Sequence, residues 1–374
     1  MNIRGKAVIV TSFDTYENRT DLLRKFFTAQ GYSVEVLASS FSHFHKTVHT
    51  DRKAGYTYLP AVAYKKNISA ARLYSHYRFS REVLAAAEAH TPDILYILLP
   101  PNSLANAGRI YKARHPECVL ALDVIDLWPE TLPIRRFKEV FPLSLWKKMR
   151  TNALSSADVV LTECSLYKEF LEREATDRAH TLYMAHRETR QISPALRDDA
   201  LEICFLGSIN NITDIEAICA FVRGAAKKKR VVLHIIGDGE SSERLVSEAQ
   251  ASGAEVKFYG MVFDEDFKQR VFARCRFGLN IMKESVCIGL TMKSVDYFAA
   301  GLPIINNIKG DTAELVERYS AGFALNAETA DAILSQGTQE HLLMRARARK
   351  LFDEFFSERA FMDRLGGVFK GLLK

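Results

Sequence analysis

The chain has 374 residues, of which 48% are hydrophobic and 26% are charged. This length exceeds one ordinary hydrophobic core and predicts two domains, and this composition excludes an intrinsically disordered chain. The formal net charge of +6 is mild, so it matters only where the basic residues cluster.

Short apolar runs alternate with helix-length segments along the whole chain. The expected strands cover residues 7–11, 33–37, 94–98, 119–124 and 159–162, and then 203–206, 231–236, 256–259, 277–281 and 303–306. Helices are expected, for example, at residues 18–30, 70–89, 214–228 and 241–252. Continuous apolar strands separated by helices indicate parallel sheets that are covered on both faces.

The alternation restarts near Leu201, after the polar and aperiodic segment 186–200. We therefore expect two doubly wound α/β domains in series, at residues 1–190 and 201–345. The C-terminal residues 346–374 are helical, with no strand after them, and are expected to pack on one of the two domains, with the first as a candidate. In such sheets ligands bind at the carboxyl ends of the strands, so the cleft between two such domains is the expected site.

The N-terminal stretch "MNIRGKAVIVTS" has one short apolar run and no cleavage region, so it predicts a first strand rather than a signal peptide. No window approaches 18 apolar residues, so no transmembrane helix is expected. Six cysteines are scattered without a CxxC pair, which favours buried, reduced thiols. We expect a cytoplasmic protein, with contact to the cytoplasmic face of the inner membrane left open.

Basic residues cluster in two segments of the first half, Tyr64–Arg81 and Thr131–Arg150. The first holds five Lys or Arg residues and no acid, and the second holds six basic residues against Glu139 alone. Such clusters suit phosphates, anionic lipid headgroups or nucleic acid, although a solvated face explains either segment alone equally well.

Two glycine-containing loops follow strands of the second half. "CFLGSINNITD" places Gly207, Ser208 and Asn210 before a helix, where backbone and side-chain donors suit a phosphate, although an ordinary capped loop is equally compatible. In "LHIIGDGESSE", Gly237 allows close approach of the backbone to a ligand. The third glycine of a dinucleotide fingerprint would fall at Ser242, so an NAD oxidoreductase is the least favoured class.

The stretch "GLTMKSVDYFAAGLPIIN" predicts a short, mostly apolar helix that begins near Thr291. Lys293 in the first turn opposes the usual preference for acids there, which is explained if an anion binds in front of it. Asp296 lies three residues on, on the same face, so a cation for a diphosphate and a carboxylate for ribose are presented together. The alternative is a surface Lys–Asp pair worth about 0.3 kcal/mol.

This stretch, with "IIGDGE", "FYGMV" and "CFLGS", resembles the nucleotide-sugar-binding domain of GT-B glycosyltransferases of the family 4 type, found in bacterial capsule and surface-polysaccharide synthesis. "DVIDLWPET", "YKKNISAARLYSHYRF" and the region that begins "SFDTYENRTDLLRKFF" resemble the first domain of the same group. The resemblance covers most of the chain. It implies a GT-B fold of two Rossmann-like domains facing across a cleft.

On the donor side, the resemblance matches Asp296 to the acid at the ribose and Lys293 to the basic residue near the diphosphate. Thr291, at the start of the same helix, is a further candidate for binding the donor. It also implies that Gly260, Met261 and Val262 line the nucleotide base. The sequence departs from the family at Ile288, where many members carry a glutamate; Glu284 is the nearest acid. "SINNITD" also stands where an Arg/Lys pair is usual.

On the acceptor side, Asp126 matches a polar position that faces the sugar and the acceptor, so it is the candidate catalytic residue. Asn18 and Arg19 replace a glycine-rich loop at the first helix, where Arg19 is a candidate for phosphate or acceptor. His43 and Arg72 are further candidates for the acceptor or a phosphate.

The leading hypothesis is a transferase that moves a sugar from a nucleotide-diphosphate sugar to a glycan or lipid-linked glycan, with retention and without a metal or other cofactor. Asp264-Glu265-Asp266 is treated as a helix start rather than a metal site. Two alternatives remain: a nucleotide-sugar epimerase of the same fold, and a non-catalytic protein that binds phosphate or nucleic acid through the basic segments. The leading hypothesis involves no nucleic acid.

Overall fold

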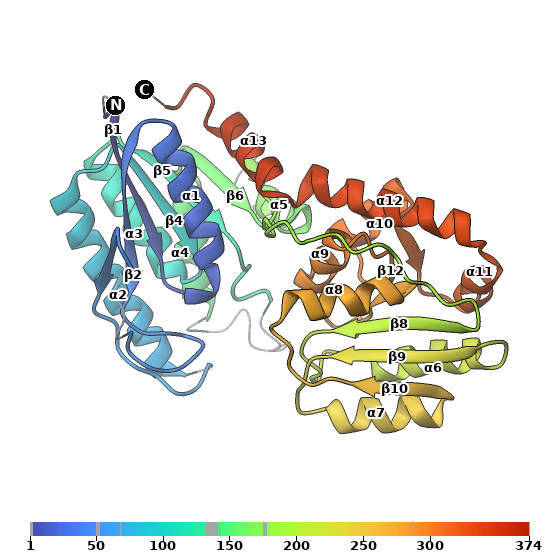
Figure 1. Cartoon of the computed structure of the whole chain (residues 1–374). Helices are drawn as coiled ribbons and strands as arrows, with labels where there is room; N and C mark the ends of the chain where they lie inside the picture. Colours follow the sequence, from blue (N-terminus) through green and yellow to red (C-terminus); the bar gives the residue numbers. More distant parts are fainter. Residues whose placement is uncertain are drawn as a thin grey trace. The chain divides into compact units, whose positions relative to one another are not determined.

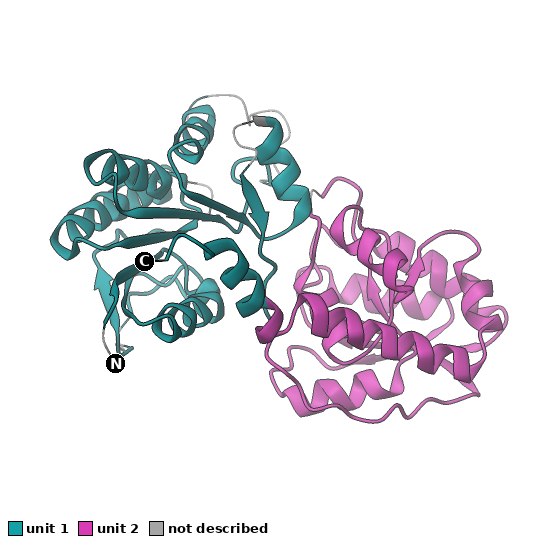
Figure 2. Ribbon diagram, turned by 90° about the horizontal axis from the view of Figure 1, so that it is seen from above, with its two compact units in different colours: residues 1–185, 361–374 teal, residues 186–360 magenta. Residues whose placement is uncertain are grey.

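Two compact units make up the chain in the computed structural model (Figure 1, Figure 2). The structure describes residues 3–49, 53–67, 69–131, 141, 143–174, 178–286 and 288–373. Unit 1 comprises Met1–Ala185 and Phe361–Lys374, and unit 2 comprises His186–Ala360. The expected limits were 1–190, 201–345 and 346–374; the observed change of unit near the C-terminus comes later, after residue 360.

Unit 1 contains a parallel sheet of seven strands in the order β3-β2-β1-β4-β5-β6-β7. Its strands are β1 (Gly5–Thr11), β2 (Tyr32–Ser39), β3 (Tyr56–Leu59), β4 (Ile94–Leu99), β5 (Val119–Val124), β6 (Val159–Thr162) and β7 (Ala179–Thr181). Its helices are the 3₁₀ turn η1 (Asp14–Tyr16) and α1 (Glu17–Ala29), α2 (Ala70–His90), α3 (Asn102–Arg114), α4 (Leu143–Leu154), α5 (Ser165–Glu174) and α13 (Glu358–Phe369).

Unit 2 contains a parallel sheet of six strands in the order β10-β9-β8-β11-β12-β13. Its strands are β8 (Ala200–Leu206), β9 (Arg230–Ile236), β10 (Ala254–Phe258), β11 (Phe277–Asn280), β12 (Ile304–Asn306) and β13 (Gly322–Ala324). Its helices are α6 (Ile215–Ala226), α7 (Ser242–Ala251), α8 (Glu265–Arg274), α9 (Met292–Ala299), α10 (Asp311–Tyr319), α11 (Thr329–Ser335) and α12 (Thr338–Phe355).

Both sheets are doubly wound, with helices on their two faces (Figure 1). In each unit the strand order runs outward in one direction and then reverses, which places a switch point between β1 and β4 and another between β8 and β11. The central strands are buried along their whole length, as β4 and β8 show. Such strands read as continuous apolar runs because helices cover both faces. The expected α/β architecture is confirmed.

The C-terminal helix α13 packs in unit 1, far in sequence from its neighbours. Phe361, Leu365 and Phe369 are buried in one cluster with side chains of α1 and β1. The ring of Phe369 meets that of Phe27 edge to face, with 5.3 Å between centroids. The end of the chain therefore completes the core of the first unit.

Two arginines of the basic segments are buried, whereas the other described lysines and arginines of these segments are exposed or partly exposed. Arg150 is fully buried, and its guanidinium donates to Glu130 and to the carbonyl of Trp128. Arg72 and Tyr64 are also buried. The part of the second segment at residues 132–140 and 142 lies outside the described residues. Arg150 and Arg72 therefore cannot be surface charges, because their side chains hold the interior of unit 1.

Five cysteines are described, and all are free and buried, as expected. Cys287 lies outside the described residues. No helix in the described ranges is long and apolar enough to cross a membrane.

Candidate active site

The predicted donor residues of unit 2 gather at the switch point of its sheet. The loop after β8 and the start of α9, which follows β11, lie at neighbouring strand ends. The strand order reverses between β8 and β11, and in open α/β sheets such a switch point is the usual place of a ligand site.

Glycines let three loops pack closely at this edge. The amide of Gly207 donates to the carbonyl of Ile236 (2.9 Å), and the amide of Gly237 donates to the carbonyl of Gly260 (2.7 Å). A Cβ atom on Gly237, whose φ is +139°, would lie 2.0 Å from the carbonyl oxygen of Gly207. Only glycine fits this position, and the three predicted glycines are brought into one row.

The side chain of Thr291 caps the start of α9. Its hydroxyl accepts a hydrogen bond from the amide of Ser294 (3.2 Å) and donates to Oδ1 of Asn280 (2.8 Å). The side chain is an N-cap that also ties α9 to the end of β11. Its predicted contact with a donor therefore requires backbone atoms or a change in these bonds.

Lys293 is a half-buried cation without a carboxylate beside it. Its Nζ atom lies over the ring of Phe205, 4.4 Å from the centroid, and it forms no ion pair with any residue that the structure describes. A Cβ atom added to Gly207 would lie 3.9 Å from Cε of Lys293, so the lysine borders the loop after β8. Burial lowers the pKa of Lys293 to about 8. An unpaired, desolvated ammonium group favours binding of an anion.

Asp296 does not pair with Lys293 but with His186, which lies in the polar and aperiodic segment 186–200. Nε2 of His186 lies 2.7 Å from Oδ1 of Asp296, and Nδ1 lies 2.7 Å from the carbonyl oxygen of Arg187. Both ring nitrogens face acceptors, so both donate when the imidazole is protonated. Burial alone lowers the pKa of His186, but the hydrogen bond and charge of Asp296 outweigh it and raise the pKa.

No sequence pattern identified His186, because it lies in an aperiodic segment and its partner is 110 positions away. A histidine after the last strand of the first domain was the only signal available.

The remaining donor candidates lie at the same edge of the sheet. Their described side chains are not gathered around one ligand position. Ser208 is exposed, whereas Oδ1 of Asn210 accepts a bond from the amide of Ile212 (3.1 Å) and so stabilises its own loop. Met261 is 70% exposed and Val262 is partly buried.

In unit 1, Arg72 forms the centre of an aromatic cluster. Its guanidinium carbon lies 4.1 Å from the ring centroid of Trp128, and Nη1 donates to the carbonyl of Asn67 (2.7 Å). Its Nε atom is buried and has no hydrogen-bond partner among the described residues. Burial lowers the pKa of this arginine. A buried guanidinium with an unused donor suits an anionic or strongly polar ligand.

Asp126 and His43 lie in the electrostatic field of Arg72. Oδ1 of Asp126 accepts a bond from the hydroxyl of Thr131 (2.5 Å). Burial raises the pKa of Asp126, although the Thr131 bond and Arg72 oppose this rise. His43 lies 2.5 Å from the hydroxyl of Tyr64, and burial, with the charges of Arg72 and Lys46, lowers its pKa to about 4. His43 is therefore a neutral imidazole at pH 7.

The side chains of Asn18 and Arg19, expected near a phosphate or the acceptor, are bonded within unit 1. Arg19 is 1% exposed and forms a two-pronged ion pair with Asp123 (2.7 and 2.8 Å), while Nη1 donates to the carbonyl of Leu182. The amide of Asn18 donates to the carbonyl of Ala185 (2.8 Å). Both side chains tie α1 to the end of β7 and the segment after it, so their donors are occupied by the fold.

Acidic residues at the start of α8 have a structural role. Oδ1 of Asp264 accepts a bond from the amide of Phe267 (3.2 Å), which makes it the N-cap of this helix. Within the described ranges, no group of three or more His, Cys, Asp or Glu residues is arranged to hold a metal ion.

A family model for glycosyl transferases group 1 matches residues 200–338, which cover most of unit 2. Unit 2 contains a glycosyltransferase group 1 domain. The expectation that the chain is an enzyme, a glycosyltransferase, is confirmed by this match. No curated protein matches the chain.

Solved structures with the same fold extend the likeness to both units. Sucrose-phosphate synthase from Thermosynechococcus elongatus is 12% identical, with 98% of this chain and 99% of that chain covered and a TM-score of 0.67. Anabaena Alr3699/HepE in complex with UDP is 13% identical, with 97% and 99% covered and a TM-score of 0.68. The lipopolysaccharide outer core galactosyltransferase WaaB is 13% identical, with 98% and 100% covered and a TM-score of 0.67. The fold is that of the GT-B glycosyltransferases.

Proposed function

We propose that this glycosyltransferase moves a sugar from a nucleotide-diphosphate sugar to a glycan or lipid-linked glycan. The observation that carries the proposal is Lys293, a half-buried ammonium group with no acidic partner among the described residues, at a helix start beside the loop after β8. A positive charge held in this way is costly for the fold and useful for binding a diphosphate. The glycosyltransferase domain match supports a sugar nucleotide as the source of that diphosphate.

Transfer leaves negative charge on the oxygen of the departing diphosphate. Lys293 and the backbone donors at the start of α9 are oriented before the reaction and would stabilise that charge without a metal. Asp296, at the next turn of the same helix, would accept hydrogen bonds from ribose hydroxyls. Its second oxygen, Oδ2, remains for this purpose while Oδ1 contacts His186.

Asp126 is our candidate for orienting the acceptor hydroxyl. Its carboxylate follows β5, lies in the field of Arg72 and is partly buried. We propose that the reaction proceeds with retention, in which an oxygen of the leaving phosphate takes the acceptor proton. Asp126 then positions groups and need not act as the base.

Product analysis tests the proposal directly. The enzyme is incubated with UDP-, GDP- and CDP-sugars, with and without bacterial lipid-linked glycans, and the products are separated by chromatography and mass spectrometry. UDP-sugars come first because Alr3699/HepE was solved with UDP and UDP-glucose. We expect a glycan larger by one sugar and a free nucleoside diphosphate.

Two results would contradict transfer. An epimerised sugar nucleotide that forms without acceptor would indicate the epimerase alternative. Strongly salt-dependent binding of nucleic acid, with no effect of any sugar nucleotide, would indicate a non-catalytic binding protein.

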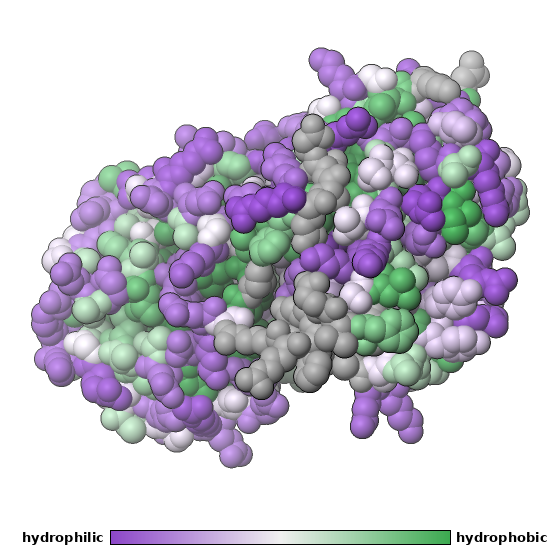
Figure 3. Space-filling model, turned by 180° about the vertical axis from the view of Figure 1, so that it is seen from behind, coloured by the Kyte–Doolittle hydropathy of each residue, from purple (hydrophilic) through white to green (hydrophobic). Residues whose placement is uncertain are grey.

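We further propose a role in surface-polysaccharide synthesis at the cytoplasmic face of the inner membrane. Tyr74 and Tyr77 are about half exposed on α2, and Arg78 and Arg81 are exposed one turn further along. Tyrosine at a headgroup interface with arginine beside it favours contact with an anionic membrane. Figure 3 shows hydrophilic and hydrophobic side chains mixed over the described surface of one face of the molecule.

Vesicle sedimentation tests this contact. An Arg78→Ala/Arg81→Ala double variant should bind vesicles rich in phosphatidylglycerol more weakly, at about 1 kcal/mol for each arginine. Arg150 is unsuitable for this test because it is buried and ion-paired. Equal binding of the variant and the wild type would contradict the proposed membrane surface. A Lys227→Ala variant, which removes an exposed positive charge of unit 2, controls for the loss of a surface charge elsewhere.

A further inference from the structure

Three polar side chains follow one another across the sheet of unit 2, apart from the residues assigned above. Glu202 lies on β8, His234 lies on β9, and Tyr259 directly follows β10. In the register of these strands Glu202 lies beside Val232, and His234 lies beside Lys257. Side chains alternate between the two faces of a sheet, and His234 and Tyr259 each stand two residues beyond those partners. All three side chains therefore share one face.

Two hydrogen bonds join these side chains. Nε2 of His234 lies 2.8 Å from Oε2 of Glu202, and Nδ1 lies 2.9 Å from the hydroxyl oxygen of Tyr259. Burial lowers the pKa of His234, although Glu202 opposes this change, so the imidazole is neutral at pH 7. A carboxylate only accepts, so Nε2 donates to Glu202, and Nδ1 accepts a bond from the hydroxyl of Tyr259. The three residues form a hydrogen-bonded relay with a fixed direction.

The relay is also connected to helix α8. Nε of Arg274, the last residue of this helix, lies 3.3 Å from Oε2 of Glu202. The buried carboxylate is therefore balanced by a guanidinium group. The ring of Tyr259 meets that of Phe267, in the first turn of α8, edge to face with 5.1 Å between centroids. Both ends of α8 are thus in contact with the relay.

The short loop between β10 and α8 takes its position from these contacts. Met261 is 70% exposed and Phe263 is 85% exposed. Within the described part of the chain, residues 261–263 form no hydrogen bond. The loop is held at Tyr259 and Gly260 on one side and at the start of α8 on the other. The relay contacts both sides, so it determines where the loop lies.

This loop stands two strands away from the proposed position of the diphosphate. Gly207 and Lys293 lie at the end of β8, and the loop follows β10, with β9 between them. Neighbouring strands are about 4.8 Å apart, so the separation along this edge of the sheet is about 10 Å. A nucleoside attached to the diphosphate covers a similar length. The exposed thioether of Met261 offers a soft apolar contact for a flat ring.

We propose that Glu202, His234 and Tyr259 are positioning residues for the base of the nucleotide. They hold the loop after β10 against β9 and α8, so that the loop meets the base in a conformation that is already fixed. Ordering a loop on binding costs affinity, and a loop that is fixed beforehand avoids this cost. This role rests on the proposed function, because it requires a nucleoside diphosphate at this edge of the sheet.

Calorimetry on the full chain tests the role with two ligands that differ in the nucleoside. One is the nucleoside diphosphate that the wild type binds best among UDP, GDP, CDP and ADP. The other is pyrophosphate, measured by its displacement of that nucleotide. Tyr259→Phe removes one hydroxyl group and keeps the ring. It should weaken binding of the nucleoside diphosphate about fivefold and leave the affinity for pyrophosphate unchanged, whereas Lys293→Ala should weaken both.

A second variant tests whether the residues act as one relay. His234→Phe removes both hydrogen bonds but keeps a flat ring stacked beside Tyr259. It should weaken nucleotide binding as much as Tyr259→Phe does. The double variant should bind no more weakly than either single variant, because both changes break the same series of bonds.

Thr329→Val is the matched control for the loss of a hydroxyl group. Thr329 is buried in unit 2, and its hydroxyl donates to the carbonyl of Ala324 (2.8 Å), away from the relay. Both affinities should stay at the wild-type values in this variant. Thermal melting of each variant verifies that it is folded.

The outcomes separate the positioning role from the proposed function. Wild-type nucleotide affinity in folded Tyr259→Phe would overturn the role, and so would an equal loss of affinity for nucleotide and pyrophosphate. Additive effects of Tyr259→Phe and His234→Phe would show that no relay connects the two residues. No binding of any nucleoside diphosphate to the wild type would contradict the proposed function, and the positioning role with it.

Discussion

Three basic side chains are buried or half-buried, and their partners show which of them stabilise the fold and which remain for a ligand. Arg19 has a carboxylate and a carbonyl for its donors, so it stabilises unit 1. Lys293 has only an aromatic ring beneath it, and His186 binds the carboxylate expected at the ribose. The sequence indicated where Lys293 and Asp296 lie, but it did not indicate their partners, because these come from distant segments.

The charge of Lys293 should make nucleotide binding depend on pH. Its pKa of about 8 means that the ammonium form, which binds the diphosphate, is lost as pH rises through that value. We expect the affinity for the preferred nucleoside diphosphate to fall about tenfold between pH 8 and 9.5, measured by calorimetry. Lys293→Arg should flatten this dependence, because guanidinium stays charged. A wild-type affinity that is constant to pH 9.5 would contradict this role.

Removal of the Arg19 ion pair should lower the stability of unit 1 without changing the proposed catalytic and donor-binding residues. Arg19→Ala leaves Asp123 buried and unpaired, so the free energy of unfolding of unit 1 should fall by about 3–5 kcal/mol. Both tryptophans, Trp128 and Trp146, belong to unit 1, so denaturant unfolding followed by their fluorescence reports this unit. A change below about 1 kcal/mol would show that the pair is dispensable.

The pair of His186 and Asp296 predicts that the free energy of unfolding decreases as pH rises. The folded-state pKa of His186 is raised above its unfolded value, so the folded state holds the extra proton. The contribution is complete below about pH 6.5 and is lost as pH rises through the folded pKa. Asp296→Asn should remove about 1–2 kcal/mol at pH 6 and little at pH 9, measured by circular dichroism of urea unfolding. An equal loss at both pH values would contradict a charged pair.

At the scale of elements, the sequence predicted the buried strands and the edge strand β10, and missed the other three edge strands. The expected helices at 18–30 and 70–89 correspond to α1 and α2 within a residue at each end. Both bury one face, and α2 also has Ser69 as a side-chain N-cap. The short strands β3, β7 and β13 were not predicted. They have three or four residues and lie at or near sheet edges, so they lack the continuous apolar run of a central strand.

Helix α13 should stabilise unit 1 although it is the last helix of the chain. Leu365→Ala empties a fully buried position in the core shared with α1, so the unfolding free energy of unit 1 should fall by about 2–5 kcal/mol in tryptophan fluorescence. Ile3→Ala in the same unit is the control, because Ile3 is 70% exposed, and should change stability by less than about 0.5 kcal/mol. Equal effects of the two variants would contradict the packing of α13 on unit 1.

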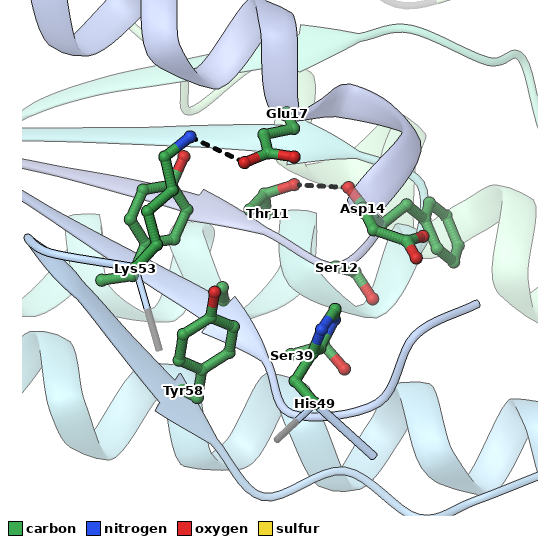
Figure 4. Close-up of a pocket in the computed structure, with 11 residues that line it drawn as sticks. Thr11, Ser12, Asp14, Glu17, Ser39, His49, Lys53 and Tyr58 are labelled. Atoms are coloured by element: carbon green, nitrogen blue, oxygen red, sulfur yellow. Dashed lines mark hydrogen bonds and ion pairs between the residues drawn. The ribbon is translucent and has the colours of Figure 1, made fainter. Parts of the chain in front are cut away.

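At the scale of the whole molecule, the donor-binding candidates belong to one doubly wound unit, unit 2, and the catalytic candidate Asp126 belongs to the other, unit 1. The general type of strand order could be predicted, because alternating strands and helices permit few topologies. The observed order places the donor residues at the switch point of unit 2. A cavity of about 300 Å³ in unit 1 (Figure 4) could not be predicted, because Asp14, Tyr58 and His49 in its lining carry no motif and meet only when β1, β2 and β3 pair.

The central claim is that α9 and Lys293 hold the diphosphate of a sugar nucleotide. Thermal shift of the wild type and Lys293→Ala against UDP, GDP, CDP, ADP and NAD tests it most directly. A nucleoside diphosphate at about 100 times its dissociation constant should stabilise the wild type by about 2.7 kcal/mol, and the variant should lose this shift. No shift with any of the five, or an equal shift in the folded variant, would contradict the account.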